Sequence, residues 1–251
     1  MSDIIIDIKN LSCEDNTGRL QNISFSVKRG EDLVLYGPEN SGIRLLLSII
    51  LGFNKNYTGD IIFLDKNMKD YDYIDMHSQK KFIGYLHENY GLISNMTVDE
   101  NISLPLRYHS KLSEDEIKKI VSRLIFNLNL DHCKKLRPID LTQSEILKTA
   151  YARSIALDPD ILIIEHAFGG QSALDIKAFT TDVYARAKKP GKSILFISYN
   201  PEKFNDLVDT YIMFFDGRIV FMGDHNSYRN SDNPYLIQYK NVSETGPMSL
   251  L

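Results

Sequence analysis

Short apolar runs rich in β-branched residues alternate along this chain with longer stretches of helical periodicity. Strands are predicted at residues 4–8, 23–27, 33–36, 59–64, 161–164, 194–197, 211–215 and 218–221. The last two are joined by Asp216-Gly217, a pair typical of tight hairpin turns. Several runs are continuously apolar, which is typical of parallel strands covered on both faces. The pattern therefore predicts an α/β protein with a parallel sheet and a β-rich start.

Two capping boxes predict where helices begin in the middle of the chain. The first spans Ser113 to Glu116, and apolar residues follow it at helical spacing through Leu128. The second spans Thr142 to Glu145 and opens a helix that we expect to continue through Leu157. The tail from about Asp224 is polar.

Length and composition narrow the class of protein. The chain has 251 residues, of which 43% are hydrophobic and 25% charged, and its net charge is -4. This balance is typical of a globular protein and argues against nucleic acid as a partner. No apolar run approaches the ~18 residues of a membrane span, and the start lacks a basic secretory signal, so we expect a cytoplasmic protein. Cys13 and Cys133 have no metal-ligand spacing, and no metal site is predicted.

Residues 37–44 have the glycine spacing of a P-loop but not its chemistry. A working loop reads G-x-x-x-x-G-K-[ST]; its backbone N–H groups and Lys bind phosphates and its hydroxyl binds Mg²⁺. Here Ile43 stands at the Lys position and Arg44 at the hydroxyl position, while Glu39 adds a carboxylate to an anion site. The candidate loop comprises Gly37, Pro38, Glu39, Asn40, Ser41, Gly42, Ile43 and Arg44. It is either an altered nucleotide site or a turn that uses glycine for geometry alone.

The order of these segments resembles the ATP-binding cassette (ABC) ATPase family along nearly the whole chain. The resemblance rests mainly on residues 95–106, 152–164 and 216–223, which match the segments after the Q-loop, before and within the Walker B strand, and at the closing hairpin. It implies a P-loop NTPase fold with a RecA-like core, an antiparallel β subdomain and an inserted helical subdomain. We expect an ABC ATPase-like domain over 1–223, with the helical subdomain at about 88–155, and a tail over 224–251 for dimer or partner contact.

A narrower resemblance points to the ATPase of Mla/Mce-type phospholipid transporters. It rests on Phe168-Gly169-Gly170-Gln171 and on the tail that contains Asp232-Asn233-Pro234 and Gly246-Pro247. Such ATPases serve bacterial inner-membrane permeases, so the resemblance implies a peripheral protein on the inner (plasma) membrane.

The positions that carry out hydrolysis in this family hold other residues here. Glu165 and His166 stand where the Walker B Asp and Glu are expected, His87 at the Q-loop Gln and Tyr199 at the switch His. The D-loop Asp is matched by Ser172, and the adenine-stacking aromatic residue by Cys13. We expect His87 and Tyr199 to approach His166 in a small polar cluster, with a structural role.

The family's signature L-S-G-G-Q is matched by Leu141-Thr142-Gln143-Ser144-Glu145. In the family, the glycines let backbone N–H groups approach the γ-phosphate bound to the partner subunit. Side chains at Gln143 and Ser144 and a charge at Glu145 oppose that approach. We interpret Thr142 to Glu145 as a capping box that outlasted its ligand role.

Losing three or four hydrogen bonds to charged groups costs roughly 5–10 kcal/mol, which would move a micromolar ATP site to tens of millimolar or weaker. We therefore expect a pseudo-ATPase without a cofactor, docked through His87–His109 on a Mla/Mce-type permease as a homodimer or heterodimer. One alternative is a weak ATPase that uses ATP and Mg²⁺ through Arg44, Glu165 and His166. Another is a regulatory protein that binds an ABC transporter without taking part in its cycle.

Overall fold

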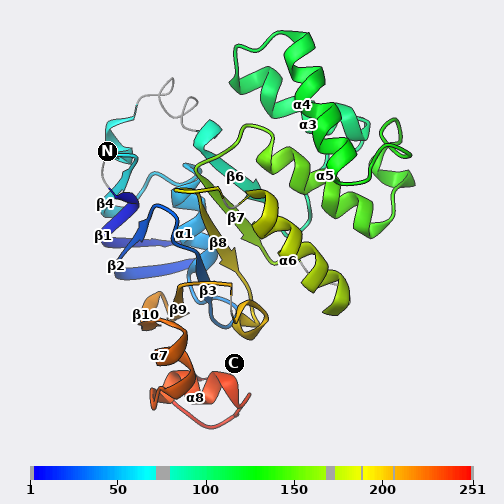
Figure 1. Cartoon of the computed structure of the whole chain (residues 1–251). Helices are drawn as coiled ribbons and strands as arrows, with labels where there is room; N and C mark the ends of the chain where they lie inside the picture. Colours follow the sequence, from blue (N-terminus) through cyan, green and yellow to red (C-terminus); the bar gives the residue numbers. More distant parts are fainter. Residues whose placement is uncertain (1–2, 72–79, 168–172, 188, 206, 250–251) are drawn as a thin grey trace. The chain divides into compact units, whose positions relative to one another are not determined.

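The computed structural model describes residues 3–71, 80–167, 173–187, 189–205 and 207–249. Two compact units share the chain (Figure 1). Unit 1 comprises Met1–Asp72 and Ser193–Leu251, and unit 2 comprises Tyr73–Lys192. The subfamily match at residues 168–171 and the D-loop position Ser172 lie outside the described residues.

An antiparallel sheet forms the first part of unit 1. Its strand order is β2 (Gly18–Lys28), β1 (Ile4–Asp15), β4 (Thr58–Phe63) and β5 (Lys66–Asn67), with the short helix η1 (Met68–Asp70) behind β5. The β1–β2 ladder runs from Ile4 opposite Lys28 to Asp15 opposite Gly18. Both strands are longer than the apolar runs that predicted them, because ladder hydrogen bonds continue through the polar residues near the turn.

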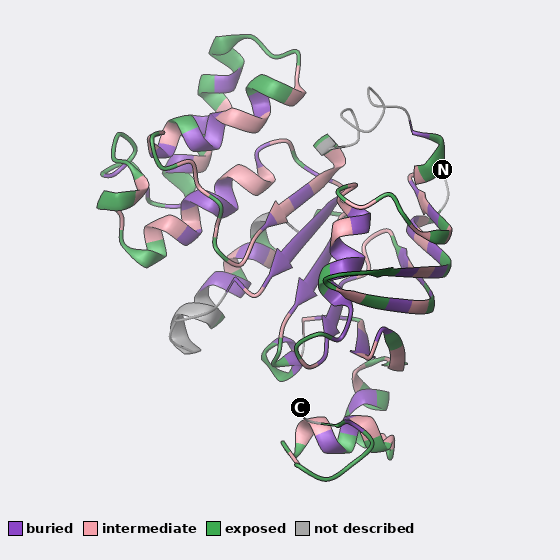
Figure 2. Ribbon diagram, turned by 180° about the vertical axis from the view of Figure 1, so that it is seen from behind, coloured by how far each residue is buried: buried purple, intermediate pink, exposed green. Residues whose placement is uncertain are grey.

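The second part of unit 1 is built on parallel strands. β3 (Leu33–Tyr36) pairs in parallel with both β8 (Ser193–Ile197) and β9 (Thr210–Phe215). The residues of β3 and β8 are all buried, as Figure 2 shows for these strands, which confirms the expectation from their continuous apolar runs. β10 (Arg218–Gly223) returns antiparallel to β9 through Asp216 and Gly217, whose φ values of 50° and 72° confirm the predicted tight turn.

Helices complete unit 1. α1 (Ile43–Ile50) follows β3 and buries six of its eight residues, while η4 (Pro201–Phe204) follows β8. In the C-terminal tail, α7 (His225–Asn230) and α8 (Pro234–Lys240) are capped by the side chains of Asp224 and Asn233. The tail is packed through aromatic rings: Tyr228 stacks on Tyr211 at 4.5 Å between centroids.

Unit 2 contains the strands β6 (Ile83–Leu86) and β7 (Ile161–Glu165), which pair in parallel. In its described residues, the α-helices are α3 (Val98–His109), α4 (Glu114–Asn127), α5 (Gln143–Ile155) and α6 (Ala173–Ala187), and the short helices are η2 (Lys80–Phe82) and η3 (Pro138–Asp140).

Both predicted capping boxes are present in unit 2. Ser113 caps α4 and Thr142 caps α5. α5 ends two residues before the predicted Leu157, because Asp158 takes a left-handed φ of 53° and Pro159 follows it. A third capping box, formed by Thr97 and Glu100 at the start of α3, was not predicted.

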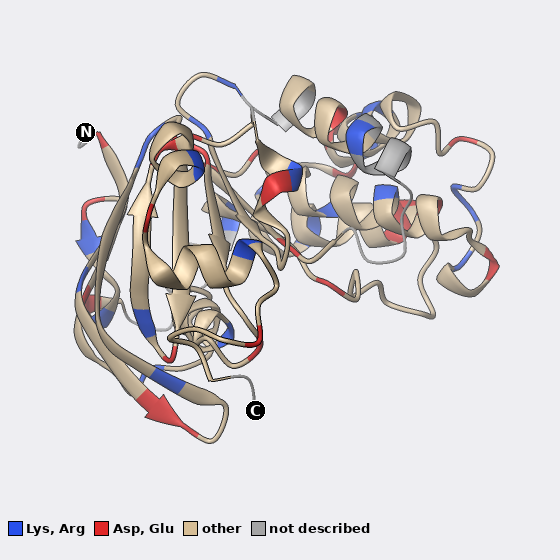
Figure 3. Cartoon of the chain, turned by 90° about the horizontal axis from the view of Figure 1, so that it is seen from below, with Lys and Arg blue, Asp and Glu red and all other residues tan. Residues whose placement is uncertain are grey.

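The described residues carry charges of both signs and show no segregation of one sign along the ribbon (Figure 3). Lys and Arg side chains are interspersed with Asp and Glu on the ribbon (Figure 3). Among the described helices, none is both long and apolar enough to cross a membrane.

Candidate functional site

The turn between β3 and α1 is the predicted P-loop, and its glycines are required by crowding. A Cβ on Gly37 would lie 2.2 Å from the carbonyl oxygen of Phe214. Gly42 has a φ of 100°, and a Cβ there would lie 2.7 Å from the carbonyl oxygen of Arg19. Both distances are shorter than a van der Waals contact allows. Unit 1 therefore needs both glycines whether or not the loop holds a phosphate.

The two altered positions of this loop face different environments. Ile43 is only 6% exposed and belongs to the buried face of α1. Arg44, Glu39 and Asn40 are exposed. The side chain that stands at the Lys position is thus part of the apolar core of unit 1.

The C-terminal tail reaches the P-loop within unit 1. The Tyr239 hydroxyl lies 2.6 Å from the carbonyl oxygen of Tyr199, the switch position, and 3.3 Å from that of Gly37. Burial, together with the nearby Tyr199, raises the pKa of Tyr239 to about 12, so this hydroxyl stays protonated and can donate. The phenol ring of Tyr199 is half exposed. Tyr239 therefore ties the tail to two segments that bind nucleotide in the family.

In unit 2, the carboxylate at the end of β7 is already engaged by the protein. Glu165 is 4% exposed, and its Oε2 accepts a hydrogen bond from the hydroxyl of Tyr85 on β6. His87 Nε2 lies 3.9 Å from the same oxygen, and the rings of Tyr85 and His87 meet edge to face at 5.7 Å. The structure thus brings the Q-loop and Walker B positions together, but around a tyrosine hydroxyl.

His166 follows Glu165 with a left-handed φ of 42°, which is uncommon for a residue other than glycine. His87 lies beside Glu165, and the expected approach of His87 and Tyr199 to His166 stays a prediction. Tyr199 belongs to unit 1. The Q-loop region is anchored by Arg153 of α5, whose guanidinium donates to the carbonyl oxygens of Tyr90 and Gly91 at 2.8 and 2.7 Å.

The signature positions form the capping box that the sequence predicted. The Thr142 hydroxyl accepts from the Glu145 N–H at 3.3 Å, and Glu145 Oε2 accepts from the Thr142 N–H at 2.8 Å. The N–H bond of Thr142, followed by the contact with His132, lowers the pKa of Glu145 to about 2. Thr142, Gln143 and Ser144 are exposed. The start of α5 is therefore closed by side chains instead of glycines.

A pocket of about 550 Å³ lies beside Cys13 in unit 1. Cys13 itself is 7% exposed, and its thiol contacts the carbonyl oxygen of Asn56 at 3.1 Å. Tyr57, just before β4, lines the same pocket, so an aromatic ring is present although the matching position in β1, Cys13, has none. Sequence reasoning missed Tyr57 because only the pairing of β1 with β4 brings the residue before β4 beside Cys13.

A second feature that the sequence did not indicate lies in unit 2. His132, Cys133 and Glu145 place their ligand atoms within 4.8 Å of one another. The adjacent His132 and Cys133 were the only signal, and Glu145 joins them through the fold.

The fold and the retained P-loop geometry define an ABC ATPase cassette of the P-loop NTPase type, and comparison with known proteins agrees. The family model described as ABC transporter matches residues 20–168, and the chain belongs to this family. Among solved structures, cbiO1 of Clostridium perfringens, part of the ABC transporter complex cbiONQ, superposes with a TM-score of 0.80 at 22% identity over 96% of both chains. A dimeric ATP-binding cassette bound to ADP and Pi superposes with a TM-score of 0.78 at 20% identity over 88% of this chain and 98% of that chain.

Relatives of known function come from several transport systems. The intermembrane phospholipid transport ATP-binding protein MlaF of Haemophilus influenzae is 23% identical over 99% of this chain and 94% of its own length. The sulfate/thiosulfate import ATP-binding protein CysA 1 of Agrobacterium fabrum is 25% identical over 94% of this chain and 68% of its own. The molybdate/tungstate import protein WtpC of Thermococcus kodakarensis is 27% identical over 88% of this chain. The chain spans only 65% of the length of WtpC.

Proposed function

We propose that this chain is an ABC ATP-binding subunit that does not hydrolyse ATP and that serves as a structural or regulatory partner of a Mla/Mce-type lipid permease. The observation that carries the proposal is the environment of Glu165. Hydrolysis in the family needs one carboxylate for Mg²⁺ and a second to polarise water. Here the first is hydrogen-bonded to Tyr85, and the second is replaced by His166.

The altered P-loop supports the same proposal from the other unit. Phosphate binding requires a cation at position 43, where a buried isoleucine stands. The glycines that remain are accounted for by the backbone of Phe214 and Arg19, so their presence does not argue for a phosphate. Each half of a head-to-tail site is thus deficient, because the signature positions carry exposed side chains as well.

Unit 2 offers a groove for the permease. A pocket of about 380 Å³ is lined by Leu104, Pro105, Tyr108 and His109 of α3. Its lining also includes Tyr85 of β6, Arg153 of α5 and Pro159. In ABC transporters, the region between the Q-loop and the helical subdomain receives the permease's coupling helix. This groove overlaps the predicted contact segment His87–His109 and supports docking there.

Assembly and location follow from such docking. ABC ATP-binding subunits work with membrane permeases as dimers, and a dimeric cassette is among the structures that superpose on this chain. The match to MlaF over nearly the full length of both chains supports a phospholipid transport system. The subunit would then sit on the inner membrane, as a homodimer or beside a competent second subunit.

ATP binding and hydrolysis by the purified chain and its permease complex test the proposal. We expect no binding heat with Mg²⁺ and ATP up to several millimolar, and no hydrolysis above that of Glu165→Ala. ATP-dependent lipid movement by a complex whose only ATP-binding subunit is this chain would overturn the proposal.

One observation supports the alternative, a weak ATPase with shifted ligands: Tyr57 lines the pocket beside Cys13 and could stack on adenine. This alternative predicts that the chain binds ATP with a Kd below about 0.1 mM, which corresponds to a binding free energy of roughly 5.5 kcal/mol. It also predicts loss of activity in Arg44→Ala and Glu165→Ala with unchanged folding. Tyr57→Ala should weaken binding only if adenine stacks in that pocket.

Docking has a separate test. Tyr108 on the groove side of α3 is 69% exposed, and Phe126 on α4, which does not line the groove, is 72% exposed. We expect Tyr108→Ala to abolish copurification with the permease and Phe126→Ala to leave it intact. Equal loss in both variants, or in neither, would contradict the groove as the contact.

A further inference from the structure

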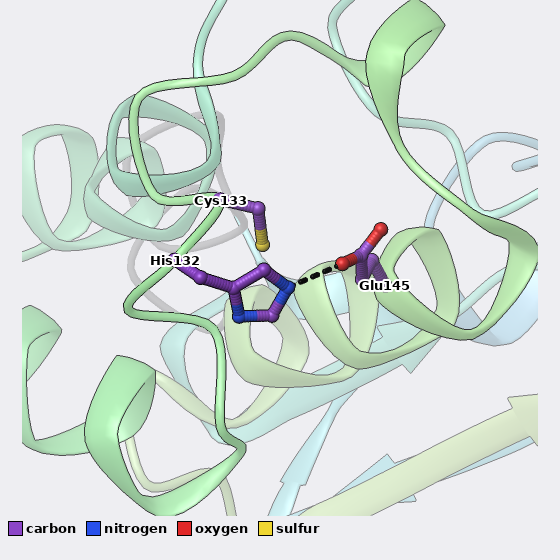
Figure 4. Close-up of side chains that lie close together, drawn as sticks. All are labelled: His132, Cys133 and Glu145. Carbon is purple, nitrogen blue, oxygen red and sulfur yellow. Dashed lines mark hydrogen bonds and ion pairs between the residues drawn. The ribbon is translucent and has the colours of Figure 1, made fainter.

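Three side chains with metal-binding atoms converge at the start of α5, as Figure 4 shows. His132 and Cys133 follow α4, and Glu145 lies in the first turn of α5. The ring Nε2 of His132 lies 2.6 Å from Glu145 Oε1, and the Cys133 thiol points toward the same space. All three ligand atoms lie within 4.8 Å of one another. None of them has a role in the proposed docking.

Hydrogen bonds hold the Glu145 carboxylate and the Cys133 backbone in place. The two oxygens of Glu145 have different partners: Oε2 accepts a hydrogen bond from the Thr142 N–H, and Oε1 contacts His132. Cys133 is 1% exposed, its N–H donates to the carbonyl oxygen of Leu130 at 3.1 Å, and its carbonyl accepts from Leu136 at 2.8 Å. In metal sites, a hydrogen bond to one carboxylate oxygen commonly orients the other oxygen toward the ion.

The same loop is fastened to the start of α3. The Lys135 ammonium donates to Asp99 at 2.6 Å, and the Asp99 N–H donates to the carbonyl oxygen of Lys134 at 3.1 Å. The thiol and the carboxylate are therefore fixed by two helices, whereas the His132 ring, 66% exposed, is able to turn. A site with two fixed ligands and one adjustable ligand needs little rearrangement to close.

The donor set indicates which ion would fit. One nitrogen, one thiolate sulfur and one carboxylate oxygen suit Zn²⁺ and, more generally, late divalent transition metals, but not Mg²⁺ or Ca²⁺. Zinc bonds of about 2.0–2.3 Å place neighbouring ligand atoms roughly 3.3–3.6 Å apart in a tetrahedron. His132 and Glu145, now 2.6 Å apart, would have to separate by less than about 1 Å, which rotation of the exposed ring permits. The thiol, within 4.8 Å of the other ligand atoms, would have to approach by up to about 1.5 Å, which requires a small shift of the loop that carries Cys133.

We propose that His132, Cys133 and Glu145 form a binding site for one zinc-class divalent cation, whose fourth position is open to water. Binding forms a sulfur–metal bond and releases the thiol proton to solvent. The His132 Nε2 that donates to the Glu145 carboxylate gives up that proton, which Nδ1 of the same exposed ring takes up through solvent, and the freed Nε2 lone pair binds the ion beside Glu145. The cation joins the loop after α4 to the first turn of α5, and so to the signature positions.

The test is a titration of the full chain, stripped of metal by a chelator, with Zn²⁺ by calorimetry and with Co²⁺ by absorption. We expect one ion per chain, proton release that is visible as a buffer-dependent heat, and an ultraviolet cobalt–thiolate band. His132→Gln, on an exposed side chain, should weaken Zn²⁺ binding about tenfold or more with unchanged thermal unfolding in the absence of metal. Glu145→Gln, which keeps a capping side chain, should do the same.

Matched controls use the other buried thiol and another histidine. Cys133→Ser should abolish the cobalt–thiolate band, whereas Cys13→Ser and His225→Gln should leave band, stoichiometry and affinity unchanged. Absence of stoichiometric Zn²⁺ binding below about 0.1 mM, which corresponds to roughly 5.5 kcal/mol, would overturn the proposal. So would binding without a thiolate band, or binding that His132→Gln leaves unaltered, since either places the ion elsewhere. If Cys133→Ser does not fold, the band in the wild type and the His132→Gln result still decide.

Discussion

The turns at residues 37–42 and 141–145 correspond to two turns that hold phosphate in related ABC ATPases. They differ in whether the family's glycines remain in this chain. The first keeps both glycines, because the backbone of Phe214 and Arg19 leaves no room for a Cβ at Gly37 or Gly42. The second has no glycine at all, and its residues 142–144 are exposed to solvent. The two turns differ because neighbouring backbone crowds the glycines of the first turn, whether or not phosphate is bound.

This difference shows how to interpret a motif that has lost its chemistry. A glycine enforced by neighbouring backbone persists after its ligand is gone, so it is evidence of fold alone. A glycine that only gave a ligand access is free to be replaced. At the start of α5, the replacement supplies a capping box, which stabilises the helix.

The largest expected effect concerns Ile43. Restoring the P-loop cation with Ile43→Lys places an ammonium in the apolar environment of α1, and we expect stability to fall by up to about 3–5 kcal/mol. ATP binding should not return, because Glu165 and the signature positions are unchanged. Denaturant unfolding and calorimetry measure both effects, with Ile43→Met as the size-matched control. ATP binding at full stability would mean that the loop lacked only its lysine.

Gly37→Ala comes next. The added methyl group would meet the Phe214 carbonyl oxygen at 2.2 Å, so the strand and loop must move apart, at a cost of about 1–3 kcal/mol. Glu39→Ala, in the exposed part of the same loop, should change the free energy of unfolding little. A harmless Gly37→Ala would show that the loop yields easily and that crowding is not the reason for its glycine.

The capping box at the signature turn should matter less. Thr142→Ala removes the side-chain acceptor for the Glu145 N–H and should destabilise the protein by about 1 kcal/mol. Thr142→Ser retains the hydroxyl and serves as the control. Thermal unfolding of the three proteins compares them; if alanine and serine behave alike, the side chain does not cap α5 in solution.

Ser144→Gly gives the smallest effect. It restores a glycine of the signature at an exposed position in the first turn of α5, where the loss should not exceed roughly 0.5–1 kcal/mol. Ser144→Ala measures the effect of removing the hydroxyl alone. A loss as large as that of Gly37→Ala would erase the distinction between the two turns.

Much of the fold could be predicted from local patterns. The run Leu33-Val34-Leu35-Tyr36 is β3 residue for residue, and Ser113 and Thr142 were correctly expected to begin helices. These features depend on apolar runs and on hydrogen bonds between residues three apart, which a sequence displays directly. The β1–β2 ladder extends into polar residues because pairing with the neighbouring strand, not hydrophobicity, sets its length.

The candidate site was less accessible to sequence reasoning. The altered identities of residues 43, 165 and 166 could be read from the sequence, but their surroundings could not. That Tyr85 occupies the Glu165 carboxylate, and that Tyr239 reaches Gly37 and Tyr199, depends on contacts between segments 40 to 202 residues apart. That Tyr57 lines the pocket beside Cys13 likewise depends on the pairing of β1 with β4, which brings distant parts of the sequence together.

The sequence by itself determined the family, the order of strands and helices, and the absence of the usual residues at the nucleotide-binding positions, since these depend on residue identity and spacing. Only the tertiary structure decided why Gly37 and Gly42 remain, which partner holds Glu165, and that His132, Cys133 and Glu145 meet. Each of these depends on distances across the fold, which neighbouring residues in the chain do not encode.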